Sequence, residues 1–470
     1  MIRDGRIADI SPSASALTAQ NPRARVVDAS NRIVLPGFVN AHYHGESFLL
    51  RTLTGRRALA SWESRAPLRD ALEKLRVSAP ATALEALYAV AGSLHLRHGT
   101  TCVGDFPLAY SAPRLQAALA GFTLAGIRHA VVLQSWDQID AARGPGPADN
   151  RRGLVSLGKP DEFTLYSLDN HLRAARDLRV PLCAHGAETP GEVERFRRNF
   201  KKGPLAVLKE YGALTGGTQL IHGNHIGQAD VALLRTADAT LTLCPLSAAA
   251  KRTGYPLLSR LSGSDVRLCI GTDWGAMDMM AEIRFLRMLP NLAGGIRHFS
   301  AVELLRMATI NGADALGLGA QTGSLEVGKR ADMIFLSPHL AGPAGWDPPA
   351  ESIAALVVDH LDRGAITDVL VNGQFVVREG VGAAEDLTEQ KRVCRALFDS
   401  FAGRSAAPDG PARKGTPLLP ETEEGLLPGF HTPPAEDVPF SSGGRNSAAS
   451  GIPGSAAEKK IHKVFGENDY

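Results

Sequence analysis

Eight short apolar runs, separated by segments with helical periodicity, constrain the fold of this chain more than any other feature. The runs are Gly37–Ala41, Thr100–Gly104, His129–Leu133, Leu154–Leu157, Pro181–Ala184, Gln219–Ile221, Thr240–Cys244 and Arg267–Gly271. This alternation predicts an α/β fold, a (β/α)8 TIM barrel, with functional residues at the carboxyl ends of the strands. A doubly wound open sheet is the alternative, but no glycine-rich phosphate-binding turn follows the first run.

Strand-rich segments flank the barrel pattern on both sides. Asp4-Gly5 and Asn372-Gly373 are typical hairpin turns, and each lies between short apolar segments. We therefore expect both flanks to join in a small composite β-sandwich domain. The expected organisation is an N-terminal part of the β-sandwich at 1–34, the barrel at 35–320, a C-terminal part of the β-sandwich at 321–385 and a disordered tail at 403–470. We also expect one helix over Ala301–Ala315 and two strands within Thr322–Leu336.

Composition excludes several classes of function. The 470 residues carry a formal net charge of +2, and no basic and aromatic residues interleave as they do in nucleic-acid-binding sites. Five scattered cysteines without a Cys-x-x-Cys pair favour reduced thiols. Neither a signal peptide nor a run of membrane-spanning length is present. We expect a cytoplasmic protein that acts on a small molecule and binds neither nucleic acid nor membrane. The sequence is compatible with a monomer and with a homo-oligomer.

Metal-ligating residues follow four of the predicted strands. His42 and His44 end the first, His185 ends the fifth, His222 ends the sixth and Asp273 follows the eighth. An isolated His-x-His pair is as often structural as metal-binding, but strand ends of a barrel meet at one mouth. His42, His44, His185 and Asp273 would then bind one divalent metal, zinc with iron as the alternative, and leave a position for water.

Glu188 lies three residues beyond His185, close enough to the predicted ligands to move protons between water and a leaving group. The alternative is an acidic residue at a helix start, because Thr189-Pro190 is also a typical helix N-terminus.

These motifs resemble the amidohydrolase superfamily, in its branch of cytosine deaminases, chlorohydrolases and S-adenosylhomocysteine/methylthioadenosine deaminases. The matching segments are Pro36-Gly-Phe-Val-Asn-Ala-His-Tyr-His44, Ala184-His-Gly-Ala-Glu-Thr189, Ile221-His222, Cys244-Pro-Leu-Ser247, Gly271-Thr-Asp273, Ala308-Thr-Ile-Asn-Gly-Ala313 and Gly323-Ser-Leu-Glu-Val-Gly-Lys-Arg-Ala-Asp332. The resemblance implies a metal-dependent hydrolase of non-peptide carbon–nitrogen bonds, most often a deaminase. It implies metal ligation by His42, His44, His185 and Asp273, proton transfer by Glu188, and orientation of water or of the intermediate by His222. Asp273 would also help to accept the proton of the attacking water.

Two parts of the sequence depart from this pattern, the segment after the fourth strand and the residue after Asp273. Relatives that act on nucleosides usually carry Pro-His near the end of the fourth strand, where this chain has Leu154-Val-Ser-Leu-Gly-Lys159, which argues against an adenosine-like substrate. Lys159 is a surface lysine or, in the alternative, a carbamylated bridge between two metals. Trp274 follows Asp273 and either stacks on a flat substrate or packs in the core.

The main hypothesis is a deaminase of a heterocyclic or related small molecule. Hydrolysis of an amide, a substituted amine or a halide on the same site is a second, and a non-catalytic barrel scaffold is a third. The complete set of six site residues argues against the scaffold.

Overall fold

The computed structural model describes residues 1–54, 66–107, 111–135, 138–139, 154–156, 165–254, 261, 264–292, 298–338, 349–382 and 387–401. All of them belong to the first of two compact units, residues 1–407. The predicted disordered tail at 403–470 and Lys159 lie outside the described residues.

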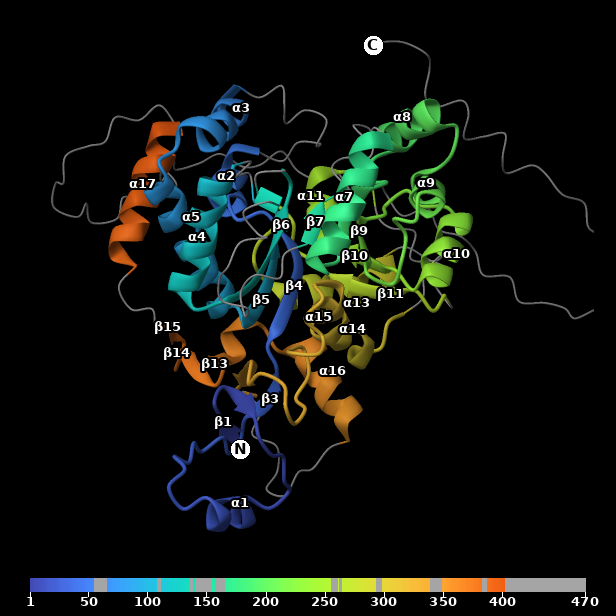
Figure 1. The fold of residues 1–470 in the computed structure, drawn as a ribbon. Coiled ribbons are helices and arrows are strands. Elements are labelled where there is room, and N and C mark those ends of the chain that lie inside the picture. Colours follow the sequence, from blue (N-terminus) through green and yellow to red (C-terminus); the bar gives the residue numbers. More distant parts are fainter. Residues whose placement is uncertain are drawn as a thin grey trace, which may run out of the picture. The chain divides into compact units, whose positions relative to one another are not determined.

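Parallel strands form the barrel at the centre of this unit (Figure 1). They are β4 (Phe38–Tyr43), β5 (Thr100–Asp105), β6 (Arg128–Leu133), β7 (Leu154–Ser156), β8 (Leu182–Gly186), β9 (Thr218–His222), β10 (Thr240–Leu243) and β11 (Arg267–Ile270). Each pairs in parallel with the next along the chain. The two ends meet where the amides of Thr272 and Asp273 donate to the carbonyl of His42, at 3.0 and 2.9 Å. All eight predicted strands are confirmed, and so is the barrel.

Helices cover the barrel from outside, with α4 and α5 on one side and α7 to α10 on the other (Figure 1). The helices are α2 (Ser47–Thr54), α3 (Ala66–Glu73), α4 (Ala81–Arg97), α5 (Ala112–Ala125), α7 (Leu165–Leu178), α8 (Pro190–Phe200), α9 (Pro204–Glu210), α10 (Gln228–Ala237), α11 (Pro245–Lys251), α13 (Met279–Leu292), α14 (Ala301–Met307), α15 (Ile310–Ala315), α16 (Ala350–His360) and α17 (Thr388–Phe401). Prolines lie in the first turn of α5, α8, α9 and α11, where the missing N–H costs no helical hydrogen bond, and α13 carries one in its interior.

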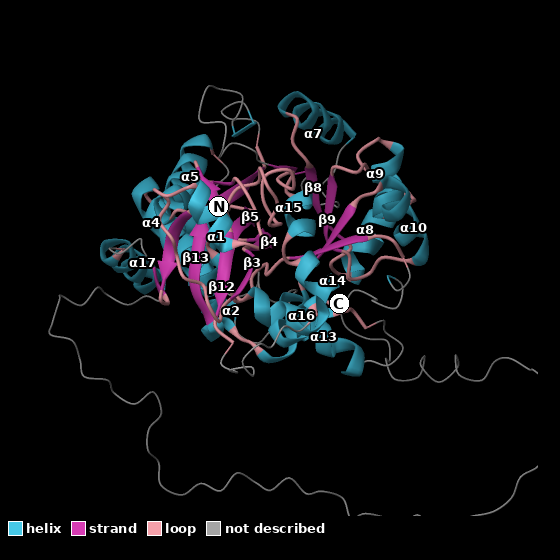
Figure 2. Cartoon of the chain, turned by 90° about the horizontal axis from the view of Figure 1, so that it is seen from below, coloured by secondary structure: helices cyan, strands magenta, loops and turns pink. Residues whose placement is uncertain are grey.

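A separate antiparallel sheet combines strands from both flanks, as predicted. Its order is β15 (Val381–Gly382), β14 (Gln374–Arg378), β13 (Ile366–Val371), β12 (Met333–Leu336) and β3 (Ile33–Pro36). Figure 2 shows β12 and β13 beside barrel strands β4 and β5. Asn372 and Gly373, both with positive φ (49° and 72°), turn the chain between β13 and β14. A two-residue turn of this kind matches the twist of the strands that it joins.

The amino-terminal hairpin is also confirmed, as a small sheet of its own. Strands β1 (Ile2–Arg3) and β2 (Arg6–Ile7) pair across Asp4-Gly5. Arg6 forms an isolated antiparallel bridge with Arg330, so the hairpin contacts the segment that precedes β12. Helix α1 (Ala14–Gln20), which follows, was not predicted; the Ser13 hydroxyl caps it by accepting a hydrogen bond from the amide of Ala16 at 3.2 Å.

Two local predictions were wrong. The helix expected over Ala301–Ala315 is broken into α14 and α15 at Thr309, whose backbone (φ −133°, ψ −98°) is not helical. The break leaves the carbonyl of Ala308 to accept the amide of Val39 in β4, at 2.8 Å. Of the two strands expected within Thr322–Leu336, only β12 forms, because residues 324–327 pair with no strand in the described part of the chain.

A buried ion pair joins the barrel to the antiparallel sheet. Arg128, at the start of β6, donates to both carboxylate oxygens of Asp332, at 2.8 and 3.2 Å. The amide of Asn372 and the hydroxyl of Thr322 donate to the same carboxylate, at 2.7 and 2.8 Å. The carboxylate therefore fixes β6, the start of β12 and the β13–β14 turn to one another.

All five cysteines are free and buried, which agrees with the expected reduced thiols. In the described part of the chain, no helix is both long and apolar enough to cross a membrane.

Candidate metal centre

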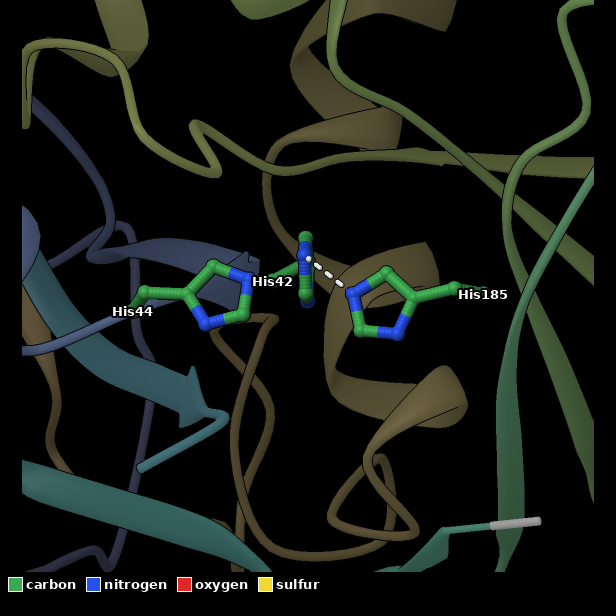
Figure 3. Close-up of side chains that lie close together, drawn as sticks. All are labelled: His42, His44 and His185. Carbon is green, nitrogen blue, oxygen red and sulfur yellow. Dashed lines mark hydrogen bonds between the residues drawn. The ribbon is translucent and has the colours of Figure 1, made fainter. Parts of the chain in front are cut away.

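Three imidazoles and one carboxylate meet at the carboxyl ends of the barrel strands. His42 lies in β4 and His44 one residue beyond it, His185 lies in β8, and Asp273 follows β11. In Figure 3 the rings of His44 and His185 lie on either side of His42, and a dashed line joins His42 to His185. The side chains that the sequence predicts to converge therefore do converge.

The spacing of the donor atoms suits a tetrahedral metal. The Nε2 atoms of His185 and His42 are 3.3 Å apart. Asp273 Oδ1 lies 3.4 Å from Nε2 of His42 and 3.3 Å from Nε2 of His44. Two ligands bonded to zinc at the usual lengths and a tetrahedral angle are separated by about 3.3–3.4 Å.

Two sets of donor atoms in the described residues could hold a metal ion. One is His42, His44 and His185, and the other is His42, His222 and Asp273; within each set all donor atoms lie within 4.8 Å of one another. His42 belongs to both, so the two sets describe one centre, with His222 at its edge.

Buried polar atoms without hydrogen bonds point to the same centre. Among the described residues, the buried atoms Asp273 Oδ1, His222 Nε2 and His42 Nδ1 have no hydrogen-bond partner. Burying such an atom without a partner costs about 1–3 kcal/mol, so native proteins usually supply one. A cation next to Asp273 Oδ1 and His222 Nε2 would use both lone pairs, so the residues present fit a divalent metal.

The backbone at the centre is tightly constrained. A Cβ atom added to Gly271 would lie 2.7 Å from Cβ of His42 and 2.8 Å from its carbonyl oxygen, so only glycine fits there. Asn40 Oδ1 accepts a hydrogen bond from the amide of Thr272 at 3.1 Å, and Asn40 Nδ2 donates one to the Thr272 hydroxyl at 2.7 Å. These two bonds tie β4 to the end of β11. His222 and Asp273 have positive φ (75° and 49°). Non-glycine residues with this backbone often lie at functional sites.

Burial keeps the imidazoles of His42 and His185 neutral, the form that binds metals. Burial lowers the pKa of His42 to about 3 and holds the pKa of His185 well below its usual value. His44 presents Nε2 to Asp273, while its Nδ1 lies 3.0 Å from the carbonyl oxygen of Phe106. Such a hydrogen bond fixes the ring and its tautomer.

Glu188 lies inside the site. Helix α8 begins at Pro190 with Thr189 as its N-cap, and the acidic residue of the first helical turn is Glu192. Glu192 accepts the amides of Ala187 and Glu188, at 3.1 and 3.0 Å. The Glu188 carboxylate points elsewhere, with Oε2 3.8 Å from Nε2 of His222. Its alternative interpretation as the acidic residue of the first turn is therefore wrong.

Lys251 and Ser247 complete the site, and sequence analysis assigned neither of them a role. The Lys251 ammonium donates to Glu188 Oε1 at 3.1 Å and to Asp273 Oδ2, and the Ser247 hydroxyl donates to Asp273 Oδ2 at 2.6 Å. Both residues lie in α11, four positions apart and so on one face of the helix. That spacing, after the seventh strand, and the place of Ser247 in the matching segment Cys244-Pro-Leu-Ser247 were the sequence signals for the pair.

The charges of this group stabilise one another. Burial alone would raise the pKa of Asp273, but the Lys251 ammonium and the adjacent imidazoles of His42 and His44 hold it well below its usual value. Burial would likewise raise the pKa of Glu188, but His222 and Lys251 lower it. The two carboxylates in turn raise the pKa of Lys251 above its ordinary value, against the effect of burial. The site therefore contains two carboxylates and one ammonium.

Two aromatic rings border the imidazoles. The Phe106 ring lies edge to face with His185, at a centroid distance of 4.5 Å. The Trp274 ring is 6.0 Å from that of His44 and is half-buried. Trp274 also packs on the hydrophobic core, so the two interpretations of this residue are compatible.

Known proteins share this sequence pattern and fold. Residues 33–376 match the amidohydrolase family. A 5-methylthioadenosine/S-adenosylhomocysteine deaminase from Moorella thermoacetica is 30% identical over 401 residues, which cover 81% of this chain and 89% of that protein. A second such deaminase, from Haloquadratum walsbyi, is also 30% identical, and the match covers 72% of this chain and 79% of that protein.

Solved structures show the same fold at lower identity. A zinc-bound adenosine deaminase from Xanthomonas campestris superposes with a TM-score of 0.73 at 23% identity, covering 86% of this chain and 93% of that one. A mutant of an atrazine chlorohydrolase from Arthrobacter aurescens, in complex with zinc and atraton, superposes with a TM-score of 0.73 at 20% identity. The match covers 85% of this chain and 94% of that one. The family match spans most of the chain and includes every residue of the centre described above, so this chain is a hydrolase of the amidohydrolase family.

Proposed function

We propose that this protein is a metal-dependent hydrolase that removes an amino group, as ammonia, from an unsaturated carbon of a heterocyclic small molecule. The observation that carries the proposal is the tetrahedral spacing of donor atoms on His42, His185 and Asp273, with the Glu188 carboxylate beside them. The names of the relatives in Moorella thermoacetica and Haloquadratum walsbyi, both deaminases, support the same class of reaction.

In this proposal His42, His44, His185 and Asp273 hold one divalent metal, zinc with iron as the alternative. Zinc in the two similar structures supports that choice. A metal bound there would polarise water and lower its pKa towards about 7. His222 lies at the edge of the centre with Nε2 near Glu188, so it orients the water and stabilises the intermediate.

Glu188 exchanges protons with the substrate. Its carboxylate lies 3.8 Å from Nε2 of His222 and 3.1 Å from the Lys251 ammonium, so its place at the edge of the metal centre is fixed. The water gives up one proton as its oxygen bonds to carbon, and the leaving amino group takes one proton to depart as ammonia. Glu188 carries out the second transfer.

Trp274 provides a flat surface for the substrate. Its ring is half-buried and lies 6.0 Å from that of His44, beside the metal centre. Stacking of a planar heterocycle on this ring would hold the reacting carbon near the imidazoles. Leu154-Val-Ser-Leu-Gly-Lys159, without the Pro-His of nucleoside-specific relatives, favours a heterocycle without an attached sugar.

The experiment that tests the proposal combines elemental analysis of the purified protein with ammonia release from a panel of aminated heterocycles. We expect about one metal per chain and ammonia from at least one compound. Metal without ammonia, but with turnover of chlorinated or amide analogues, would move the assignment to another leaving group. A chain that binds no metal would contradict the proposal and favour a scaffold.

A further inference from the structure

Helix α11 delivers two hydrogen-bond donors to one oxygen of Asp273. Ser247 Oγ donates to Oδ2 at 2.6 Å, and Lys251, one helical turn later, donates to the same atom. Glu282 of α13 accepts the amide of Leu246 at 3.0 Å and so caps the first turn of α11, which has no side-chain cap of its own. This cap helps to fix the position of α11, and with it the positions of both donors relative to Asp273.

Lys251 contacts one oxygen of each of the two carboxylates and leaves the other oxygen of each without a contact to the ammonium. Its ammonium contacts Asp273 Oδ2 and, at 3.1 Å, Glu188 Oε1. The other oxygen of Asp273 faces His42 and His44, at 3.4 and 3.3 Å. The other oxygen of Glu188 faces His222, at 3.8 Å. The Lys251 side chain is 6% exposed, so little solvent competes for these contacts.

We propose that Lys251 is a positioning residue that assigns different tasks to the two carboxylates. Asp273 ligates through Oδ1 alone, and Glu188 Oε2, rather than Asp273, takes the proton of the attacking water. From the sequence, Asp273 was expected to help to accept that proton. This inference rests on the proposed function and refines it.

The hydrogen bonds explain why Asp273 is unsuited to accept a proton. Oδ2 already accepts one hydrogen bond from a hydroxyl and one from an ammonium, and hydrogen bonds to a charged donor are about twice as strong as neutral ones. A proton arriving at Oδ2 would have to displace one of them. Glu188 Oε2 lies 3.8 Å from the imidazole of His222, beyond hydrogen-bond distance, so a proton can reach it without displacing that contact.

The resulting reaction balances. One O–H bond of water breaks and its proton goes to Glu188 Oε2, while the oxygen bonds to the ring carbon. The C–N bond then breaks, and the same proton passes from Glu188 to the amino group, which leaves as ammonia. No oxidant, reductant or second proton donor is needed.

Cobalt substitution tests the ligation half of this inference. The apo protein is loaded with Co2+, whose d–d absorption weakens as its coordination number rises. In Lys251→Met, Asp273 Oδ2 is released and becomes a second oxygen ligand, so we expect weaker d–d bands than in the wild type; Ser247→Ala gives a smaller decrease. Lys202→Met, at an exposed ion pair with Glu210, is the matched control and keeps the wild-type spectrum.

Unchanged cobalt bands in Lys251→Met would overturn the inference, and if that variant does not fold, Ser247→Ala decides by the same criterion. Wild-type protein that takes up no Co2+ would instead contradict the proposed function. The two failures are therefore distinguishable.

A double-mutant cycle tests the kinetic half. Glu188→Gln lowers kcat by about 100-fold or more in the wild-type background, because the proton acceptor is lost. If Lys251 acts by positioning Glu188, the same change lowers kcat less than about 10-fold in Lys251→Met, since residues that act together are not additive. Equal losses in both backgrounds would show that Lys251 acts independently of Glu188.

Discussion

The Nε2 atoms of His42 and His185 lie 3.3 Å apart, although 143 positions separate the two residues in the sequence. Two neutral imidazoles can approach this closely through one N–H···N hydrogen bond, or through a cation that lies between two lone pairs. The same spacing recurs between His44 and Asp273, so the arrangement is that of ligands around a common centre.

Removal of one ligand should release the metal. In His185→Ala we expect metal content to fall well below that of the wild type and turnover to be lost, because two imidazoles and one carboxylate remain. Elemental analysis after dialysis measures this directly. His298→Ala, at an exposed histidine outside the centre, is the control. Wild-type metal content in His185→Ala would remove His185 from the ligand set.

Glu188→Gln should separate metal binding from proton transfer. Glutamine keeps the size of the side chain and does not contact Asp273 Oδ1, so metal content should remain that of the wild type, while kcat falls by about 100- to 10,000-fold. Steady-state kinetics and elemental analysis of one preparation give both values. Glu194→Gln, on the exposed face of α8, should change neither. Undiminished turnover in Glu188→Gln would exclude Glu188 as the proton carrier.

The sequence predicts much of the barrel and its metal centre because both depend on strands. Alternation of apolar runs and helices locates each strand, and carboxyl ends of parallel strands meet, so His42, His185 and Asp273 could be grouped without a structure. The break at Thr309 could not be predicted in this way, since it depends on a hydrogen bond between Ala308 and Val39, far away in the sequence.

Lys251 was missed for a related reason. It ends α11, and its position in the sequence suggests an ordinary solvated lysine. Only the docking of α11 by Glu282 brings its ammonium between Asp273 and Glu188. Helix docking is a tertiary property, so the residues that hold the predicted ligands in place are less visible in the sequence than the ligands themselves.

The ion pair between Arg128 and Asp332 should stabilise the fold independently of the metal centre. Arg128→Met leaves the buried carboxylate without its cation, and breaking such a pair costs about 3–5 kcal/mol of unfolding free energy. Denaturant unfolding measures the loss, and metal content per folded chain should not change. Arg392→Met removes the exposed pair with Glu389 and should cost under about 1 kcal/mol. Similar costs for both variants would contradict the structural role of Asp332.

Trp274→Ala should affect substrate binding more than metal binding. The ring lies beside His44 without being a ligand, so removing it takes away a stacking surface and leaves the donor atoms in place. We expect KM for a planar substrate to rise by about 10-fold, as for the loss of one aromatic contact, and metal content to remain at one per chain. Trp274→Phe should restore much of the affinity. An unchanged KM in Trp274→Ala would leave the residue with a packing role alone.

Gly271→Ala should disturb the centre through its backbone. The new Cβ would lie 2.7 Å from Cβ of His42, a distance that requires β4 or the Gly271–Asp273 segment to move. Overpacking of this kind costs about 1–3 kcal/mol, and a shift of His42 also breaks the 3.3 Å spacing with His185. We therefore expect a lower melting temperature together with weaker zinc binding in chelator competition. Gly217→Ala, where the nearest atom is 3.8 Å from the added Cβ, should show neither effect. If Gly271→Ala bound zinc as tightly as the wild type, the close approach of Gly271 to His42 would be unimportant for the metal centre.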